Sequence, residues 1–187
     1  MNKKVREMCF CSMMVALMAI FSWISIPIGA VPVTLQTFAV FAAVGILGGK
    51  LGTISVLVYV IMGAVGIPVF AGFSGGFGVI TGPTGGYIVG FILSALIMWM
   101  MEKVFGSNIF ILTASMIIGL IVCYAFGTVW FMTVYTQNTG AVGLGAVLGW
   151  CVIPFIIPDA VKIICAVLIT SRVRKPVNSM LANNTAR

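Results

Sequence analysis

Histidine is absent from the sequence, and acidic residues occur at only three positions, Glu7, Glu102 and Asp159. Hydrolases with a catalytic triad need a histidine, glycosidases need two neighbouring carboxylates, and the usual zinc sites need histidine or grouped cysteine ligands. The chain lacks these combinations. Its composition therefore argues strongly against an enzyme, and it predicts neither a metal nor a cofactor.

Charged residues of either sign are also scarce. They make up 7% of the chain, whereas a soluble domain carries roughly 25%. Hydrophobic residues make up 61%, and the mean hydropathy is +1.23. A chain with so few solvated side chains cannot cover a core in water. The sequence therefore predicts an integral membrane protein, built as one bundle without a soluble domain.

Cysteine occurs in an odd number and without the spacing of a disulfide framework. The five residues lie scattered in apolar runs, at Cys9, Cys11, Cys123, Cys151 and Cys165. We therefore expect small, buried, hydrophobic side chains there and no disulfides.

Six apolar runs are long enough to cross a bilayer as helices, which need about 20 residues each. The predicted fold is thus all-α, with six transmembrane helices in a single membrane domain covering residues 1–187. The runs lie near residues 8–27, 33–49, 51–70, 84–102, 108–134 and 144–171.

The basic residues give this six-span arrangement an orientation. Nine of the ten fall on one side of it, at Lys3, Lys4, Arg6, Lys50, Lys103, Arg172, Arg174, Lys175 and Arg187. Because cytoplasmic loops are enriched in Lys and Arg, both termini are predicted to be cytoplasmic in a multi-pass protein of the cell membrane. Residues 176–187 are expected to form a flexible cytoplasmic tail. The net charge of +7 is then a sign of topology, and no nucleic-acid partner is expected.

The segment around Gly49 and Lys50 resembles a nucleotide-binding P-loop but lacks two of its required residues. A P-loop ending at Gly49-Lys50 would need glycine at position 44 and Ser or Thr at position 51, where the chain has Val44 and Leu51. The chain is therefore not expected to hydrolyse ATP by itself.

The predicted outer loop at residues 68–86, PVFAGFSGGFGVITGPTGG, is uncharged and contains seven glycines in nineteen residues. Glycine allows close backbone approach, so such a loop can fold over a small ligand and offer it N–H groups. A flexible linker is the alternative, but linkers seldom carry this many aromatic residues. We favour a lid.

Polar side chains gather at the outer ends of two spans. Thr34, Gln36 and Thr37 lie where the second span starts, and Tyr87 opens the fourth. Thr34 could simply cap a helix. Gln36 points more strongly to a site, because an amide within lipid is costly unless it is paired.

An acid and a base stand three positions apart inside the last apolar run, at Asp159 and Lys162 in FIIPDAVKII. On a helix they share a face, and Asp159 lies roughly 20 Å above the cytoplasmic end at Arg172. Each charge costs on the order of 3 kcal/mol in mid-membrane, so the pair must face the bundle interior or a cavity. It could be a packing ion pair, a proton relay or the floor of a binding site.

Small residues form a stripe along the first span at Ser12, Ala16 and Ala19. Such stripes let a second helix approach closely in lipid. The stripe could serve packing within the bundle or an external partner, and the sequence alone does not separate the two.

Three segments of the sequence are distinctive: PVTLQT at 32–37, YVIMGAVGIPVFAGFSGGFGVITGPTGGYIVGF at 59–91 and IPFIIPDAVKIICA at 153–166. They resemble the BioY family, and the similarity extends over nearly the whole chain. Members of that family are biotin-specific S components of energy-coupling factor (ECF) transporters. The resemblance implies a six-helix bundle that captures biotin with high affinity from outside. It delivers biotin only together with a membrane coupling protein and two cytoplasmic ATPases.

The resemblance also assigns roles to residues. Asp159 would accept from an N–H of the biotin ureido ring, and Lys162 would donate to the ureido carbonyl or to a carboxylate. Gly72, Phe73, Gly75 and Gly76 would cover the ligand, with Tyr87, Gln36 and Thr37 lining the mouth. In S components an Ala-x-x-x-Ala stripe on the first helix docks the coupling protein. Ser12 here replaces one alanine and keeps the position small.

A different class of function stays open beside this one. A stand-alone secondary carrier could use Asp159 as its proton site. Inverted repeats or paired broken helices would favour that mechanism, and the two halves of the sequence show no convincing repeat.

Overall fold

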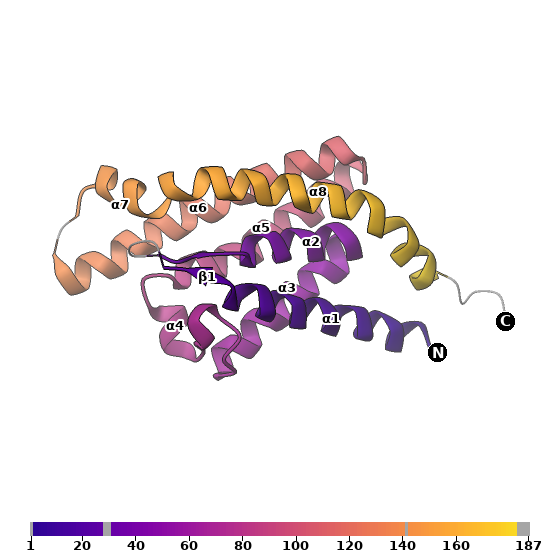
Figure 1. The fold of residues 1–187 in the computed structure, drawn as a ribbon, viewed down its shortest axis with the longest axis horizontal. Helices are drawn as coiled ribbons and strands as arrows, with labels where there is room; N and C mark the ends of the chain where they lie inside the picture. Colours follow the sequence, from indigo (N-terminus) through magenta and orange to yellow (C-terminus); the bar gives the residue numbers. More distant parts are fainter. Residues whose placement is uncertain (1, 28–30, 141, 183–187) are drawn as a thin grey trace.

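A polypeptide in lipid must satisfy its own backbone hydrogen bonds, so apolar runs fold as helices. The computed structural model, which describes residues 2–27, 31–140 and 142–182, is accordingly dominated by helices (Figure 1). The long ones are α1 (Lys3–Trp23), α2 (Gln36–Leu47), α3 (Gly49–Val65), α5 (Gly85–Phe105), α6 (Ile109–Thr139) and α8 (Ile153–Ala182). The short elements are β1 (Ser25–Ile26), β2 (Val33–Thr34), η1 (Ala71–Phe73), α4 (Phe77–Thr81) and α7 (Leu144–Cys151).

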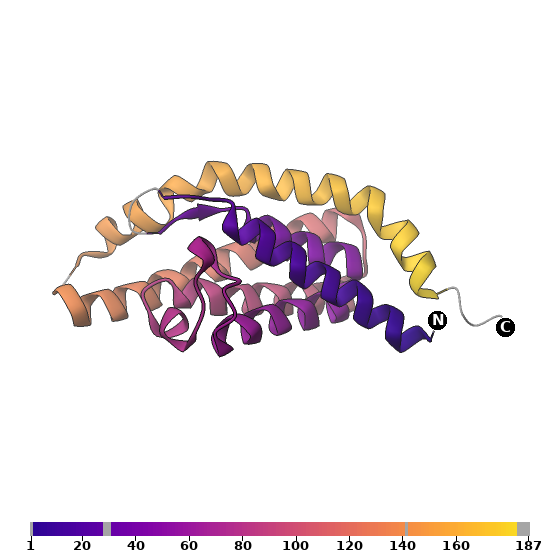
Figure 2. The ribbon, with the colours of Figure 1, turned by 60° about the horizontal axis from the view of Figure 1, so that its bottom comes forward.

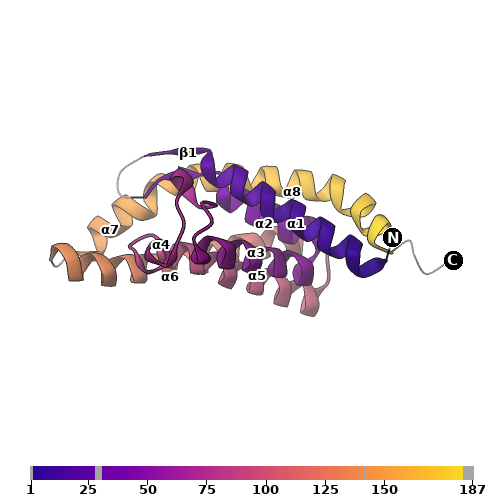
Figure 3. The same ribbon diagram turned by 90° about the horizontal axis from the view of Figure 1, so that it is seen from below.

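The helices form two layers (Figure 3). One layer contains α1, α2 and α8, with α2 packed between the other two, and the second contains α3, α5 and α6. A tight turn at Gly48, where φ is 82°, connects α2 to α3 and so joins the layers. The N-terminus of α1 and the C-terminus of α8 lie at the same end of the molecule (Figures 1 and 2).

In the described part of the chain, four helices are long and apolar enough to cross a membrane, and they come from the first, fourth, fifth and sixth predicted runs. The second and third runs form shorter helices, because part of each run is not helical. Residues 33–34 pair with 25–26 as a small antiparallel ribbon, and α2 begins only at Gln36, whose N–H donates to Thr34 Oγ1 at 3.2 Å. At the end of α3, Gly66 has a φ of 112° and stops the helix.

The sixth run is divided at Val152 into α7 and α8. Helix α8 then continues through Pro176 to Ala182, well beyond the expected end of the run at residue 171. Residues 176–182, expected to be a flexible tail, are thus helical, and Arg6 Nη2 donates to the carbonyl oxygen of Leu181 at 3.1 Å. The rest of the expected tail, residues 183–187, lies outside the described residues.

A carboxylate joins three helices at the end that holds the termini. Glu102 on α5 forms an ion pair with Arg174 on α8 and accepts the backbone N–H of Gly49 at the start of α3. One side chain therefore compensates a cation and a helix N-terminus together, which fixes these helices relative to one another.

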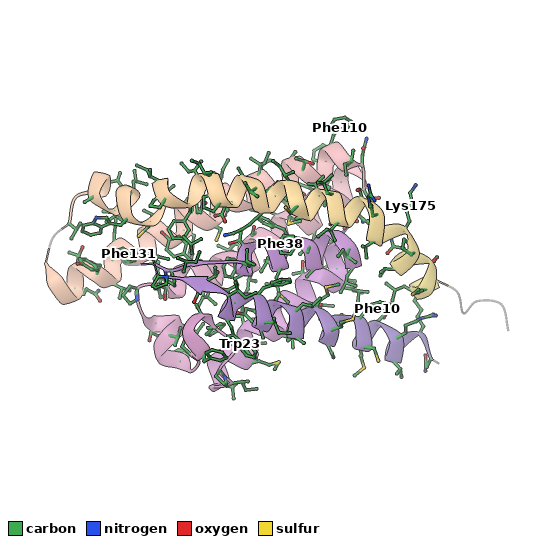
Figure 4. All side chains as sticks on the ribbon, in the orientation of Figure 1. Phe10, Trp23, Phe38, Phe110, Phe131 and Lys175 are labelled. Atoms are coloured by element: carbon green, nitrogen blue, oxygen red, sulfur yellow. The ribbon has the colours of Figure 1, made fainter. Side chains whose placement is uncertain are left out.

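The outer surface of the bundle is apolar. Along α8, one face is buried and holds Asp159, Lys162 and Ala166, while the opposite face exposes residues such as Ile157 and Ile164. Phe110 near the start of α6 is 79% exposed and points away from the bundle (Figure 4). Polar groups inside and apolar groups outside are what a bilayer requires.

The cysteines follow their expectation in part. All five are free, and Cys123 and Cys151 are buried. Cys9 and Cys165 are exposed instead, because they lie on the outward faces of α1 and α8.

Candidate ligand-binding site

A cavity of about 150 Å³ lies between the two layers. Its walls come from the starts of α2, α5 and α8, the middle of α6, the end of α7 and the connection between α3 and α5. The starts of α2, α5 and α8 are at the end of the bundle opposite the termini (Figure 1). Most of the lining is apolar, and the side chains with N–H or O–H groups are Thr34, Gln36, Thr37, Ser74, Thr84, Tyr87, Tyr124 and Lys162, with Asp159 as the only acid.

The polar end of the cavity is the pair predicted from the sequence. Lys162 Nζ lies 2.7 Å from Asp159 Oδ1, and the two side chains are only 7% and 2% exposed. The hydroxyl of Tyr124 on α6 donates to Asp159 Oδ2. Asp159 therefore has one donor on each oxygen. An ammonium has three N–H donors and a carboxylate about four acceptor sites, so both groups can still bind a ligand.

Gln36 is held by a chain of hydrogen bonds that fixes which way its amide faces. Tyr59 on α3 donates its single hydroxyl proton to the carbonyl oxygen of Val69, at 2.8 Å. Its oxygen must then accept from the Gln36 side-chain NH₂, 2.7 Å away. The amide carbonyl of Gln36, a cavity-lining residue, is therefore the end left free to accept from a ligand.

Tyr87 is fixed by close packing between α5 and α6. A Cβ atom at Gly127 would lie 2.2 Å from the Tyr87 ring, so only glycine leaves room for it. The Tyr87 hydroxyl shares a hydrogen bond with Thr128 Oγ1 at 3.2 Å. This phenol is therefore a rigid part of the cavity wall.

The connection between α3 and α5, residues 66–84, is the lid loop. The residues by which it lines the cavity differ from the four that are expected to cover the ligand. Gly72, Phe73, Gly75 and Gly76 do not line the cavity, and Phe73 is 64% exposed. The lid loop instead contributes Phe70, Ala71, Ser74, Val79 and Thr84.

The position of Phe70 explains this difference. Its ring is 1% exposed and lies against the backbone of α3 at Gly63, where a Cβ would be 2.0 Å from the ring. The ring also meets Tyr59 edge-on, with centroids 5.6 Å apart. Because Phe70 is anchored inward, Gly72 and Phe73 after it are exposed, and Gly75 packs against the backbone of Ile67 instead of the cavity.

Of the predicted site residues, Asp159, Lys162, Gln36, Thr37 and Tyr87 are brought together around the cavity. Tyr124 was missed, although a phenol in the middle of an apolar span signals a need for a partner in lipid. Other lining residues could not be predicted, because the sequence does not distinguish an apolar side chain that faces a cavity from one that faces lipid. They include Phe70, Phe91, Cys123, Cys151 and Phe155.

A second hollow, an apolar groove of about 680 Å³, runs along the outside between α1 and α3. It is lined by the small-residue stripe Ser12, Ala16 and Ala19. Ser12 and Ala16 are exposed, so they are not buried by packing within the bundle. Ala19 is buried in the bundle, so the exposed part of the stripe is Ser12 and Ala16.

Comparison with known proteins places the chain in a family. The family model described as BioY matches residues 1–179. The chain belongs to the BioY family. It is 41% identical to the biotin transporter BioY of Thermotoga maritima over 172 residues, covering 91% of this chain and 97% of the relative. It is 43% identical to the probable biotin transporter BioY of Pyrococcus horikoshii over 171 residues, 91% and 98% of the two chains.

A solved structure gives the same result for the fold. The S component for biotin from an ECF-type ABC transporter superposes with a TM-score of 0.83, is 30% identical and matches 93% of each chain. The helical membrane fold predicted from the sequence is therefore confirmed as that of an ECF S component. The assignment to the BioY family made from the three sequence segments is confirmed as well.

The buried ion pair predicts a non-additive pair of substitutions. Asp159→Asn leaves Lys162 without its counter-ion, and Lys162→Met leaves Asp159 with Tyr124 alone. Breaking one side of a buried pair costs about 3–5 kcal/mol, whereas removing both charges is often nearly neutral. Thermal unfolding in detergent should therefore show lower stability for each single variant and partial recovery for the double variant. Strictly additive losses would show that the two charges are independent, and Lys103→Met at an exposed position is the control.

Proposed function

We propose that this chain is the biotin-binding membrane subunit of an ECF-type transporter and that biotin occupies the cavity at the Asp159–Lys162 pair. Similarity to relatives named biotin transporters and to the solved S component for biotin supports the function. The observation that carries the site is the pair itself. It consists of two buried opposite charges, 2.7 Å apart, at one end of an apolar cavity.

The chemistry of biotin matches this arrangement. The ureido ring presents N–H donors on either side of one carbonyl, so an acceptor and a donor held next to each other can bind neighbouring atoms of the ring. Asp159 accepts from one ureido N–H, and Lys162 donates to the ureido carbonyl. The free carbonyl of Gln36 is a further acceptor. Apolar residues such as Phe91 and Phe155 then surround the carbon skeleton.

The proposal includes six membrane crossings, with both termini on the cytoplasmic side. Lys50 and Lys103 directly follow Gly49 and Glu102, which contact each other beside Arg174 near the end of α8. The basic residues of α1 and of the end of α8 thus share one end of the bundle with them. Positive charge marks the cytoplasmic side, so the cavity opens toward the outside. Helix α2 spans only about 18 Å of a core of about 30 Å. The ribbon of β1 and β2 completes this crossing, since non-helical backbone is tolerated where it lines a cavity.

The partners follow from the groove and from the missing P-loop. A membrane coupling protein docks one of its helices into the groove between α1 and α3, along Ser12, Ala16 and Ala19. Two cytoplasmic ATPases bound to it supply the energy that this chain cannot supply. Small residues at the floor of the groove allow the close approach that drives helix association in lipid.

Replacing Asp159 with asparagine should weaken biotin binding at least tenfold, equivalent to about 1.4 kcal/mol. The amide cannot match a carboxylate as an acceptor, and Lys162 loses its partner. Equilibrium titration with radiolabelled biotin in detergent measures the effect. Glu7→Gln is the matched control, because it makes the same chemical change at a carboxylate outside the cavity and should leave affinity unchanged. Equal affinity of Asp159→Asn and wild type would reduce the pair to a packing contact.

Transport by the chain alone separates an S component from a proton-coupled carrier. Liposomes that contain only this protein should bind biotin and should not accumulate it when a pH gradient is applied. Accumulation driven by the gradient would contradict the need for an ATP-driven module and would favour Asp159 as a proton site.

Filling the groove should abolish docking without affecting ligand binding. Ala16→Trp places a large side chain where a partner helix would lie, so co-purification with the coupling protein should be lost while biotin affinity is kept. Met13→Trp is the matched control, because Met13 is on the same helix, 48% exposed and outside the groove. If Ala16→Trp co-purified as well as the control, the partner would bind elsewhere.

A further inference from the structure

The lid loop is held at the end of α1 by two neighbouring residues, Trp23 and Ser22, and the Ser22 hydroxyl donates to the carbonyl oxygen of Val69 at 2.5 Å. Trp23 Nε1 donates a hydrogen bond to the carbonyl oxygen of Pro68, at 3.0 Å. The Trp23 ring also stacks on Phe73, with ring centroids 4.8 Å apart and an angle of 25° between the planes. Figure 4 shows Trp23 at the end of α1 that lies far from the N-terminus. A single side chain thus holds the lid loop at two points five residues apart.

Phe73 adopts an unfavourable backbone conformation to make this stack. Its φ is 55°, and within the described residues it is the only non-glycine residue with a positive φ. A bulky residue reaches that region only when its surroundings compensate. The side chain is 64% exposed, so burial in the core does not provide the compensation. In this conformation the Phe73 ring stacks on Trp23.

The segment that Trp23 holds is also the segment that covers the cavity. Phe70, Ala71 and Ser74 line the cavity and lie between Pro68 and Phe73 or directly after them. The N–H of Phe70 donates to the carbonyl oxygen of Ser74 at 3.0 Å, which closes these residues into one turn. Pro68 and Phe73, the two contact points of Trp23, therefore flank residues that line the cavity.

The other end of the lid loop is held by a second tryptophan. Trp130 on α6 donates its indole N–H to the carbonyl oxygen of Gly82 at 3.1 Å. It also presses on α5 at Gly86, where a Cβ would lie 2.2 Å from Trp130 Cβ. The hydrogen bond of Trp23 is exposed and that of Trp130 is partly buried, so the Trp23 contact is the one that can break without disturbing a packed interface.

We propose that Trp23 is a positioning residue that holds the lid loop closed and thereby sets the rates at which biotin enters and leaves. The inference rests on the proposed function, since it takes biotin to be the molecule in the cavity. It assigns Trp23 no contact with biotin, because Trp23 is not part of the cavity lining.

The test compares association and dissociation rates of radiolabelled biotin for the wild type and for Trp23→Ala. A lid that opens more often speeds both directions, so both rates should rise about tenfold or more while the dissociation constant changes less than about threefold. A merely structural role would instead raise the dissociation rate and weaken binding. That result, or unchanged rates, would overturn the proposal.

Two further variants and one control make the result specific. Phe73→Gly removes the stacking ring at a position where glycine adopts the same φ without strain, and it should speed both rates like Trp23→Ala. Trp23→Phe keeps a ring but loses the hydrogen bond to Pro68, and its effect should be intermediate. Trp99→Ala removes a tryptophan at the opposite end of the bundle, near Gly49, and should change neither rate. If Trp99→Ala matched Trp23→Ala, general loosening would be the cause.

The proposal and the function beneath it can fail separately. A wild-type protein that binds no biotin would contradict the proposed function. Wild-type binding with unchanged rates in Trp23→Ala and Phe73→Gly would contradict the assignment of Trp23 alone.

Discussion

The structure depends on keeping two opposite charges together inside a protein that lies in lipid. Asp159 and Lys162 are 2.7 Å apart, and neither could face the bilayer without a large energetic cost. Burying them requires neighbours that supply hydrogen bonds, and Tyr124 on α6 meets one oxygen of Asp159. The pair therefore fixes which face of α8 turns inward and brings α6 beside it. The remaining donor and acceptor capacity points to a ligand with both kinds of group.

A second network links that cavity to the outside of the molecule. The carbonyl oxygen of Val69 accepts from Tyr59, which in turn holds Gln36 at the cavity. The hydroxyl of Ser22 at the end of α1 lies 2.5 Å from the same carbonyl oxygen. Val69 also lines the outer end of the groove between α1 and α3. One residue of the lid loop thus lies at the groove and also in the hydrogen-bond chain that holds Gln36.

The sequence predicted the polar residues of the site, because burying a polar group in lipid is energetically costly. An acid, a base and an amide within apolar runs stand out because each needs a partner, and Asp159, Lys162 and Gln36 all line the cavity. The helices followed from apolar run length alone. The shortness of α2 could not be predicted in this way, because Val33 and Thr34 continue the apolar run whether they form a strand or a helix. The inward residue of the lid loop was equally hidden, since Phe70 and Phe73 look alike until Gly63 and Trp23 are placed beside them.

The most direct test of the central claim is to change the charge of the ligand at the ion pair. In the biotin analogue whose ureido carbonyl is replaced by a protonated imine, the ring is a cation that Lys162 should repel. We predict that the wild type prefers biotin to this analogue by at least about tenfold, or about 1.4 kcal/mol. In Lys162→Met, where Asp159 is left as the only charge, the preference should shrink or reverse. An unchanged preference in Lys162→Met would show that the ureido ring does not bind at the pair.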